Sequence, residues 1–307
     1  MRESEMTQEL QAELHQGVLV RFFGGFYVAA DADGQEYTLR CPKKFRHQRL
    51  SPLVGDAVRF TPGQGEEEGW LVEILPRKTE CIRPPVANVT LLLVSICPSP
   101  EPDLLLVDRL LARAKKQGMK TALIVGKCDL DGGALLSQMK EEYRRADCPV
   151  LGVSARNKEG LDSVRALMRG EDCCCLAGQS GVGKSTLLNA LLDLQLETGE
   201  ISEKIQRGKN TTRYAQLLIH DGIRVLDTAG FSLLETEKGM EPEKLQELYP
   251  EFQPYIGQCR FQPCLHDREP GCAVTQAVQA GKIDGNRVER YRELLADVRL
   301  AWKNRYQ

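Results

Sequence analysis

The first part of the chain consists of short apolar runs separated by turn residues. Asp33-Gly34 and Pro62-Gly63 are two of these turn signals. About five strands within roughly 60 residues are typical of a small closed barrel such as an OB-fold. The sequence therefore predicts an N-terminal β-barrel with strands at 17–22, 26–30, 36–40, 57–60 and 70–75.

The pattern changes near residue 85, where strand-like runs begin to alternate with helical periodicity. Leu106, Leu110 and Leu111 share one face of the first helix, and Gly118 suits its end. Such alternation predicts a mostly parallel α/β sheet covered on both faces. Strands are expected at 89–96, 121–125, 149–153, 173–177, 214–220 and 223–226, with helices at 104–117, 135–143, 161–168 and 186–192.

From about residue 234 the sequence becomes helical and charged, then rich in cysteine, and it ends in a helix over roughly 286–303. An apolar stripe on this last helix, formed by Val288, Tyr291, Leu295, Val298 and Trp302, predicts docking within its own domain, with the arginines elsewhere. We therefore expect a multidomain protein: a barrel at 1–78, an α/β domain at 79–233 and an α-helical domain at 234–307.

A phosphate-binding loop follows the strand at 173–177. The sequence fits the pattern G-x-x-x-x-G-K-[ST] and leads directly into a helix. Glycines let successive N–H groups face a phosphate, Lys184 can reach the β and γ groups, and the Ser185 hydroxyl can bind Mg²⁺. The nucleotide is expected to contact Gly178, Gln179, Ser180, Gly181, Val182, Gly183, Lys184, Ser185 and Thr186.

Two segments at strand ends indicate which base is bound. In Gly126-Lys127-Cys128-Asp129, the carboxylate can accept from N1–H and the N2 amine of guanine, whereas adenine presents a lone pair at N1. Lys127 is expected along the base plane, and the backbone of Ser154-Ala155 is expected to donate to guanine O6. The combination favours GTP; an ATP-dependent RNA remodelling factor is an alternative.

The order of these motifs is unusual. In most GTPases the phosphate loop comes first and the base loops last, but here the base loops precede the phosphate loop. The sequence therefore predicts a circularly permuted P-loop GTPase domain. Such a permutation is tolerated when the original termini lie close together.

The composition limits the kinds of partner and the cellular compartment that we expect for this protein. The chain of 307 residues is 42% hydrophobic and 27% charged with a net charge of −2, which argues against wholesale coating by nucleic acid. Residues 1–16 are polar and do not resemble a signal peptide, and the longest apolar run, 89–97, is too short to span a membrane. Eleven cysteines then indicate reduced thiols or metal ligands. We expect a cytoplasmic monomer without membrane contact.

Four side chains in the last region have the spacing of a metal site. Three thiolates and one imidazole are the ligand set of closed, tetrahedral structural zinc, which can hold a segment too small to bury a core. The predicted ligands of one structural zinc ion are Cys259, Cys264, His266 and Cys272. The remaining cysteines are interpreted as packing residues.

Together, the five-strand barrel, the permuted GTPase motifs and the cysteine-rich tail resemble the ribosome small-subunit-dependent GTPase A family (RsgA, also called YjeQ). The phosphate loop, Ser154-Ala155 and the four metal ligands match the family's motifs. Asp227-Thr228-Ala229-Gly230 matches its Asp-x-Pro-Gly motif with alanine replacing proline, and 208–212 resembles its Gly-x-His-Thr-Thr-Thr switch segment. The resemblance covers nearly the whole chain.

The resemblance implies GTP hydrolysis with Mg²⁺. Thr211 or Thr212 is expected to complete the metal shell when γ-phosphate is present, Asp227 to bind Mg²⁺ through water, and the Gly230 amide to sense the γ-phosphate. The chain departs from the family where Gly126 replaces an asparagine that ties the base loop to its neighbours and contacts the base. It departs again at Asn210, which replaces a histidine near the attacking water.

The implied function is a GTPase that binds the small ribosomal subunit and its rRNA, assists late maturation, and is stimulated by the subunit. Phe231 stands where many GTPases carry a water-orienting glutamine, so intrinsic hydrolysis should be slow. A nucleotide-gated RNA-binding module with negligible turnover is the alternative. The barrel at 1–78 is expected to bind RNA, and its basic stretch 40–49 is interpreted as an RNA-backbone contact or, alternatively, as a solvated charge run.

Overall fold

The computed structural model describes residues 14–43, 45, 50–63, 65, 67–81, 85–194, 215–228 and 240–305. Contacts divide the chain into two compact units, one of residues 1–90, 168–175 and 199–230 and one of residues 91–167, 176–198 and 231–307. The first holds the barrel, and the second holds the phosphate loop, the base loops and the Cys/His cluster.

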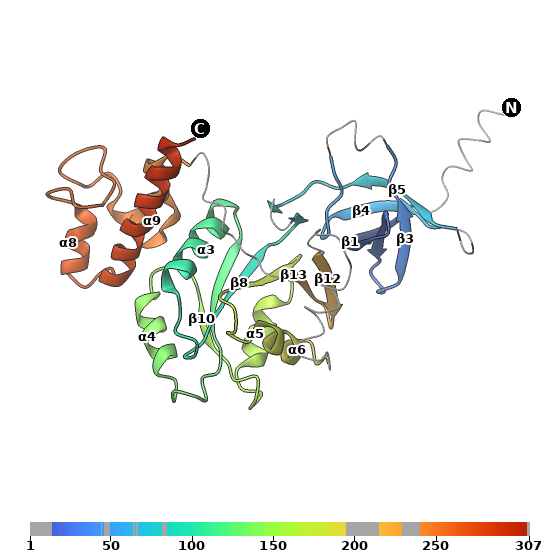
Figure 1. The fold of residues 1–307 in the computed structure, drawn as a ribbon, viewed down its shortest axis with the longest axis horizontal. Helices are drawn as coiled ribbons and strands as arrows, with labels where there is room; N and C mark the ends of the chain where they lie inside the picture. Colours follow the sequence, from blue (N-terminus) through green and yellow to red (C-terminus); the bar gives the residue numbers. More distant parts are fainter. Residues whose placement is uncertain are drawn as a thin grey trace. The chain divides into compact units, whose positions relative to one another are not determined.

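The N-terminal strands close into the predicted barrel (Figure 1). Alternate side chains point inward, so Leu19, Leu39, Phe60 and Leu71 are fully buried in the barrel core. The barrel order is β1-β2-β3-β5-β4, with β3 and β5 parallel and the other pairs antiparallel. The strands are β1 (His15–Phe23), β2 (Phe26–Ala30), β3 (Glu36–Arg40), β4 (Ala57–Thr61) and β5 (Gly69–Ile74).

One residue of the basic stretch 40–49 differs from the expectation of an exposed loop. Phe45 is 3% exposed and packs in the barrel core with Val58 and Leu71. Its ring anchors the chain there and is not available to a base in solution. The aromatic residue that the sequence places in a candidate RNA-binding loop is therefore a core residue.

The predicted alternation of strands and helices is also present. Hydrogen bonds order six strands as β10-β9-β8-β11-β13-β12, and the pairs β8/β9, β9/β10 and β11/β13 are parallel. Every residue of β8 is buried, which explains why all but Ser95 are apolar. The strands are β8 (Leu91–Ile96), β9 (Lys120–Val125), β10 (Val150–Gly152), β11 (Cys174–Ala177), β12 (Ala215–His220) and β13 (Ile223–Thr228).

Helices follow these strands, and a short separate ribbon precedes them. The ribbon pairs β6 (Glu80–Cys81) with β7 (Val86–Ala87). The helices are α3 (Leu104–Lys116), α4 (Ala134–Glu142), α5 (Leu161–Met168) and α6 (Lys184–Leu191). Asp103 caps α3 by accepting the Leu106 N–H at 2.8 Å.

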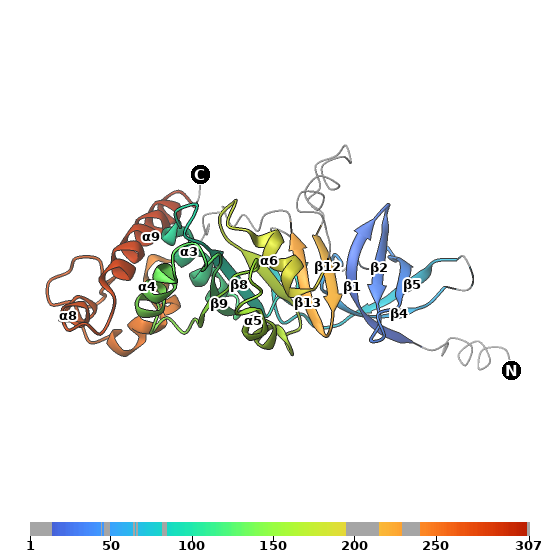
Figure 2. The same cartoon turned by 90° about the horizontal axis from the view of Figure 1, so that it is seen from below.

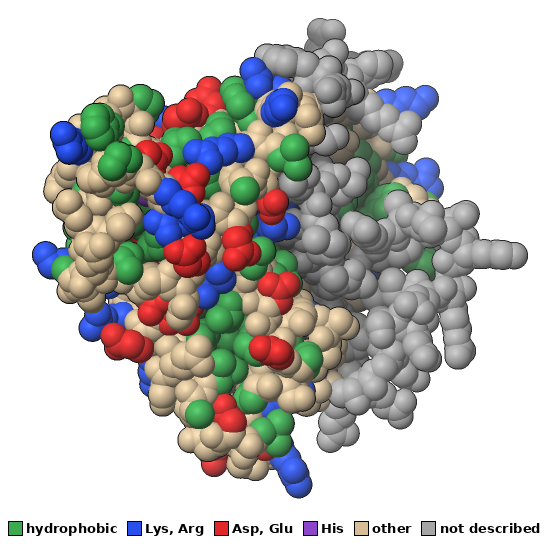
Figure 3. Space-filling view, turned by 60° about the vertical axis from the view of Figure 1, so that its left-hand side comes forward, with side chains coloured by type: hydrophobic (Ala, Val, Ile, Leu, Met, Phe, Trp, Pro, Cys, Tyr) green, Lys and Arg blue, Asp and Glu red, His purple; other side chains and the backbone are tan. Residues whose placement is uncertain are grey.

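The C-terminal region contains two short 3₁₀ helices, η1 (Pro242–Leu248) and η2 (Pro250–Tyr255), followed by α8 (Ala273–Gln279) and α9 (Gly285–Lys303). The predicted stripe on α9 is buried at Val288, Tyr291, Leu295 and Val298. Helix α9 packs beside α3 (Figures 1 and 2). On the face drawn in Figure 3, acidic and basic side chains are interspersed rather than separated by sign.

Two arginines of α9 do not lie on the solvent side. Arg287, 3% exposed, donates to Asp108 of α3 and, through Nε at 2.8 Å, to Glu251 of η2. Arg290 donates to Asp108 at 2.6 Å and to Glu142 of α4. Burial opposes the charge of Arg287, but the two carboxylates raise its pKa well above the usual value.

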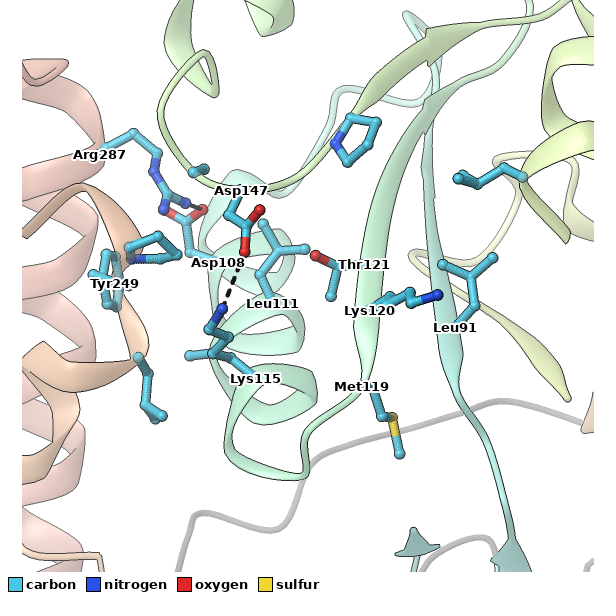
Figure 4. A pocket seen from close by; sticks show the side chains of 16 residues that line it. Leu91, Asp108, Leu111, Lys115, Met119, Lys120, Thr121, Asp147, Tyr249 and Arg287 are labelled. Carbon is cyan, nitrogen blue, oxygen red and sulfur yellow. Dashed lines mark hydrogen bonds and ion pairs between the residues drawn. The ribbon is translucent and has the colours of Figure 1, made fainter. Parts of the chain in front are cut away.

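A pocket of about 230 Å³ lies beside this ion-pair cluster (Figure 4). Arg287 points toward Asp108 on one side, and Lys115 forms an ion pair with Asp147 at 3.1 Å on another. The cluster thus joins α9 and η2 to α3 through charges removed from water. Buried charges of this kind are strongly destabilising when one partner is lost.

We predict that Arg287→Met lowers the free energy of unfolding by about 3–5 kcal/mol, because Asp108 and Glu251 would keep buried charges without their partner. Urea unfolding followed by circular dichroism measures this loss. Arg299→Met on the same helix is the matched control, since Arg299 pairs with Asp267 at 2.7 Å on the surface. It should cost less than about 1 kcal/mol. Equal losses for the two variants would contradict the prediction.

Candidate functional site

The phosphate loop is shaped by glycines in the left-handed region. Gly178, Gly181 and Gly183 have φ values of +132°, +81° and +94°, which side chains other than glycine adopt only with strain. At Gly178 a Cβ atom would lie 2.2 Å from the carbonyl oxygen of Ser95 at the end of β8. The loop therefore turns closely over this strand before α6 begins at Lys184.

Lys184 folds back over the phosphate loop. Its Nζ donates to the carbonyl oxygens of Gly178 at 2.9 Å and Gln179 at 2.7 Å. Burial lowers the pKa of this ammonium group, because its charge is partly removed from water. An ammonium group held above the loop is placed to neutralise a phosphate that lies in it.

The phosphate loop is also tied to α3. The Gln179 side chain accepts a hydrogen bond at 3.1 Å from the backbone N–H of Asp103, the residue that caps this helix. Nothing in the sequence motif specifies this contact, because the second position of the pattern accepts any residue. The start of α3 thus positions the outer side of the loop.

The first base loop contacts the phosphate loop through Lys127. This residue has a positive φ of +54°, and its Nζ donates to the carbonyl oxygens of Ser99 at 2.8 Å and Gly181 at 3.2 Å. The ammonium group therefore bridges three segments of the chain. Ser99 was not among the residues that sequence reasoning selected, and its backbone contact leaves no sequence signal.

The two base loops are joined through Asp129. Its carboxylate accepts a hydrogen bond at 2.7 Å from the hydroxyl of Ser154, and this bond lowers the pKa of Asp129. The Ser154 hydroxyl in turn accepts the Asn157 N–H at 3.2 Å. Asp129 is thus held as a carboxylate, an acceptor for two donors on one edge of a ligand.

Residues of both base loops and of the phosphate loop line one pocket of about 240 Å³. Asp129, Lys127 and Ala155 line it from the base loops, and Val182, Gly183 and Thr186 line it from the phosphate loop. The pocket brings together segments that lie some fifty residues apart in the sequence. Arg156 also lines the pocket. It directly follows Ala155 in the sequence, and this position could have identified it as a site residue.

Gly126 leaves open space beside the phosphate loop. A Cβ atom built there would lie 3.5 Å from the Ile96 carbonyl oxygen and 3.8 Å from that of Val182, which is ordinary contact, and its φ is not in the left-handed region. A side chain can therefore occupy this position without strain. The fold thus accepts a Cβ atom where this chain has glycine.

Several predicted residues are only partly placed. Asp227 lies in β13, where it pairs with Gln216 of β12; nothing is described of its side chain. Thr211, Thr212 and Gly230 lie outside the described residues, as do Asn210 and Phe231. Their expected roles toward Mg²⁺, γ-phosphate and water stay predictions.

Within the described part of the chain, Cys259, Cys264, His266 and Cys272 form a group whose ligand atoms all lie within 4.8 Å of one another. The His266 Nδ1 atom is 3.5, 3.6 and 3.4 Å from the sulfur atoms of Cys259, Cys264 and Cys272. Two ligands bound to one zinc ion at the tetrahedral angle lie roughly 3.5 Å apart. The group therefore fits a four-coordinate metal ion with His266 bound through Nδ1.

The surroundings support this metal-binding group. The backbone N–H of Ala273 donates to the Cys259 sulfur at 3.3 Å, and that of His266 to the Cys264 sulfur at 3.4 Å, as expected around thiolate ligands. Phe252 packs edge-on against the imidazole with ring centroids 5.7 Å apart. Cys264, His266 and Cys272 are buried, so a bound ion would be shielded from solvent.

Comparison with known proteins identifies the family. A family model described as the RsgA GTPase matches residues 74–237, and one described as the RsgA N-terminal domain matches residues 16–71. The chain belongs to the RsgA GTPase family. The small ribosomal subunit biogenesis GTPase RsgA of Geobacillus thermodenitrificans is 41% identical over 289 residues, covering 92% of this chain and 97% of that protein. The protein of the same name from Moorella thermoacetica is 40% identical over 286 residues, covering 92% and 97%.

Solved structures agree with this assignment. The crystal structure of YjeQ from Thermotoga maritima has a TM-score of 0.80 at 32% identity and covers 93% of this chain and 98% of that one. YloQ, described as a circularly permuted GTPase, has a TM-score of 0.76 at 30% identity with coverage of 94% and 96%. The family resemblance and the permuted GTPase fold inferred from the sequence are therefore confirmed.

The family assignment makes the chain a GTPase and, of the functions considered, favours hydrolysis over a binding module without turnover. None of the helices in the described residues combines the length and apolar composition needed to cross a bilayer.

We predict that Gly126→Asn strengthens GDP binding by about 2- to 10-fold, because the new amide can donate to the Val182 carbonyl oxygen and one hydrogen bond contributes about 0.5–1.5 kcal/mol. Titration calorimetry with GDP measures this gain. Gly126→Ala is the control, since it fills the space without adding a donor. If Gly126→Asn and Gly126→Ala bind GDP equally tightly, the expected hydrogen bond from the new amide to the Val182 carbonyl oxygen does not form.

Asp129→Asn should weaken binding of guanine nucleotides in the same titration.

Proposed function

We propose that this RsgA-family GTPase binds GTP between Asp129 and the phosphate loop, binds the small ribosomal subunit and its rRNA, and assists late maturation of that subunit. The observation that carries the nucleotide part is the pocket shared by the Asp129 carboxylate and the phosphate loop. The ribosomal part rests on relatives that are named small ribosomal subunit biogenesis GTPases. Such a factor would act in the cytoplasm, and we propose that it acts as a monomer.

The ionised form of the Asp129 carboxylate favours guanine over adenine. The hydrogen bond from Ser154 stabilises the ionised carboxylate and orients it. An ionised carboxylate accepts hydrogen bonds from guanine N1–H and the N2 amine, whereas adenine would leave it facing a lone pair. This argues against the alternative of an ATP-dependent remodelling factor. Lys127, Ser154 and Ala155 complete the base site.

Hydrolysis needs positioning and charge neutralisation more than covalent chemistry. On phosphate binding, the Lys184 ammonium would exchange the Gly178 and Gln179 carbonyl oxygens for β and γ oxygens. The Ser185 hydroxyl would hold Mg²⁺, with Thr211 or Thr212, Asp227 and Gly230 in the supporting roles that the family motifs imply. The metal supplies neutralisation of the charge that develops on the phosphates.

The activation of water is expected to need a partner. Phe231 occupies the position at which many GTPases carry a glutamine, and Asn210 replaces the family's histidine. Neither position therefore carries the residue type expected to act on the attacking water. A subunit that orders the switch segment would raise the rate, as activating proteins do for other GTPases.

We predict that purified small subunits raise GTP turnover at least about tenfold over the isolated chain, because they would order the switch segment. Phosphate release with small subunits, with large subunits and without ribosomal particles measures this effect. Asp129→Asn serves as a control for guanine dependence: it should lower GTP binding in every arm. If no ribosomal particle changes the rate, the proposed action on the small subunit is wrong.

We further propose that the metal bound by Cys259, Cys264, His266 and Cys272 is zinc and that it stabilises a helical domain at 234–307, beside a GTPase domain at 79–233 and a barrel at 1–78. Three thiolates and one imidazole form a closed ligand set without an open position for catalysis. Three of the ligands, Cys259, Cys264 and Cys272, belong to the hydrophobic cluster of this region, so a bound metal would hold the segment that carries them against that core.

We predict one zinc ion per chain by elemental analysis, and loss of that ion in Cys264→Ser together with loss of near-UV circular dichroism from the rings around Phe252. Cys41→Ser is the matched control, because Cys41 belongs to the barrel and its variant should retain full zinc content. Full zinc content in Cys264→Ser would show that this sulfur is not a ligand.

A further inference from the structure

Two separate pockets lie at opposite ends of the parallel strands. The pocket of the base loops and the phosphate loop reaches Ile96 at the end of β8. The pocket of about 230 Å³ beside the ion-pair cluster is lined by Leu91 at the start of the same strand (Figure 4). At about 3.3 Å per residue, Leu91 and Ile96 lie roughly 16 Å apart. Among the described residues, none lines both pockets. We call the second one the α3 pocket, because the last turns of α3 contribute Leu111 and Lys115 to its wall.

Two buried side chains at one end of the α3 pocket have hydrogen-bonding capacity left over. The Tyr249 hydroxyl has no hydrogen-bond partner among the described residues, although Tyr249 is only 1% exposed. Arg287 donates to Glu251 through Nε and Nη2 and to Asp108 through Nη1, which leaves N–H groups on both terminal nitrogens. Both side chains line the pocket, and Figure 4 shows them on the side of Asp108. Because an unpaired buried donor is costly, a molecule that accepts from these groups would bind favourably.

The unused capacity at this end consists of donors. Burial raises the pKa of the Tyr249 phenol well above its usual value, and the nearby Asp108 charge raises this pKa further, so the hydroxyl keeps its proton. A guanidinium has donors and no acceptor. The Asp108 carboxylate already accepts from the Tyr143 hydroxyl and from two arginines of α9. These groups therefore favour a ligand that carries an acceptor atom.

The charges around these donors disfavour an anionic ligand. Two arginines form ion pairs with three carboxylates, and each of the five side chains is at most 11% exposed. The five are Arg287, Arg290, Asp108, Glu142 and Glu251. Two positive and three negative charges leave the cluster with a net charge of −1. A further carboxylate placed here would be desolvated beside like charge, whereas a neutral carbonyl oxygen can accept from the same donors without that cost.

Most of the remaining wall is apolar. Its leucine and methionine side chains are Leu91, Leu111, Met119, Leu167 and Leu248. An aromatic or aliphatic body in contact with these side chains is removed from water, which is favourable in proportion to its apolar area. The volume of about 230 Å³ is below the roughly 300–1,000 Å³ of pockets for drug-sized ligands, so the ligand is a smaller molecule.

The α3 pocket also reaches the protein surface. Lys115 and Asp147 both line it, and their side chains are 46% and 72% exposed. A small molecule can therefore enter beside this ion pair. Because the two charges are already paired at 3.1 Å, they do not require a charged group on the ligand.

We propose that the α3 pocket is a second ligand site, for a small neutral molecule with an apolar body and a carbonyl acceptor. The carbonyl oxygen accepts from the Tyr249 hydroxyl and the Arg287 guanidinium, and the body lies against the apolar wall. A bound molecule would contact α3, α9 and the segment between η1 and η2 at once, since all three line the pocket. The inference goes beyond the proposed function and does not depend on it.

Matched probes test the class of ligand. Benzylacetone carries a ketone on a phenylethyl body, hydrocinnamate carries a carboxylate on the same body, and acetone carries the ketone alone. In saturation-transfer NMR titrations of the full chain, benzylacetone should bind with a Kd on the order of 1 mM. Hydrocinnamate and acetone should each bind at least about fivefold more weakly. No binding of benzylacetone up to ~10 mM, or equal binding of hydrocinnamate, would overturn the proposal.

Two conservative substitutions locate the bound ketone. Tyr249→Phe should weaken benzylacetone binding about 2- to 10-fold, because one hydrogen bond to the carbonyl is lost. Tyr255→Phe is the matched control: Tyr255 also belongs to the 3₁₀ segment, at the end of η2, but it is not among the residues that line the pocket. Equal affinities of the two variants for benzylacetone would overturn the proposal.

Thermal melting of the same variants tests the state of the hydroxyl. Tyr249→Phe should not lower the melting temperature, because the group that it removes has no partner among the described residues. A lowered melting temperature would show that the hydroxyl is already bonded inside the protein, and the proposed contact with a ligand would then be wrong.

GDP separates the two pockets. Saturating GDP should change the affinity for benzylacetone by less than about twofold, because no described residue lines both pockets. If GDP displaces benzylacetone, the ketone occupies the nucleotide pocket and the assignment of the α3 pocket is wrong.

Discussion

The pocket between the base loops and the phosphate loop depends on the close approach of the phosphate loop to the end of β8. At Gly178 the chain passes the Ser95 carbonyl oxygen at a distance that leaves no room for a Cβ atom. Lys127 fixes the opposite side through the Gly181 carbonyl oxygen. Both constraints act between segments that are neighbours in space and distant in sequence. A permuted order of the chain therefore leaves the pocket intact, because covalent connection contributes nothing to either contact.

The features that sequence reasoning found are those in which local chemistry dictates the residue type. Positive φ values at Gly178, Gly181 and Gly183 require glycine, so the phosphate loop can be recognised from the sequence alone. A four-coordinate metal restricts its ligands to a few residue types at short spacing, so the Cys/His group can be recognised in the same way. The barrel and the alternating strands follow from hydrophobic period and turn residues.

The features that the sequence does not reveal depend on which distant residues the tertiary fold brings together. Arg287 and Arg290 look like solvent-facing residues of an amphipathic helix, and nothing local reveals that Asp108 and Glu251 meet them in the interior. Phe45 looks like the aromatic of a binding loop but fills the barrel core. The contact of Lys127 with Ser99 is likewise made to a backbone carbonyl, which any residue supplies.

Helix α3 contacts both the phosphate loop and helix α9. Its cap, Asp103, donates to Gln179 of the phosphate loop, and Asp108, five residues further on, receives Arg287 from α9. The two attachment points lie roughly 7.5 Å apart along a rigid helix axis. Asp103 and Asp108 therefore connect the phosphate loop to α9 through a single helix. Because packed helices shift as bodies and do not stretch, a displacement of α9 would reach the phosphate loop through α3 alone.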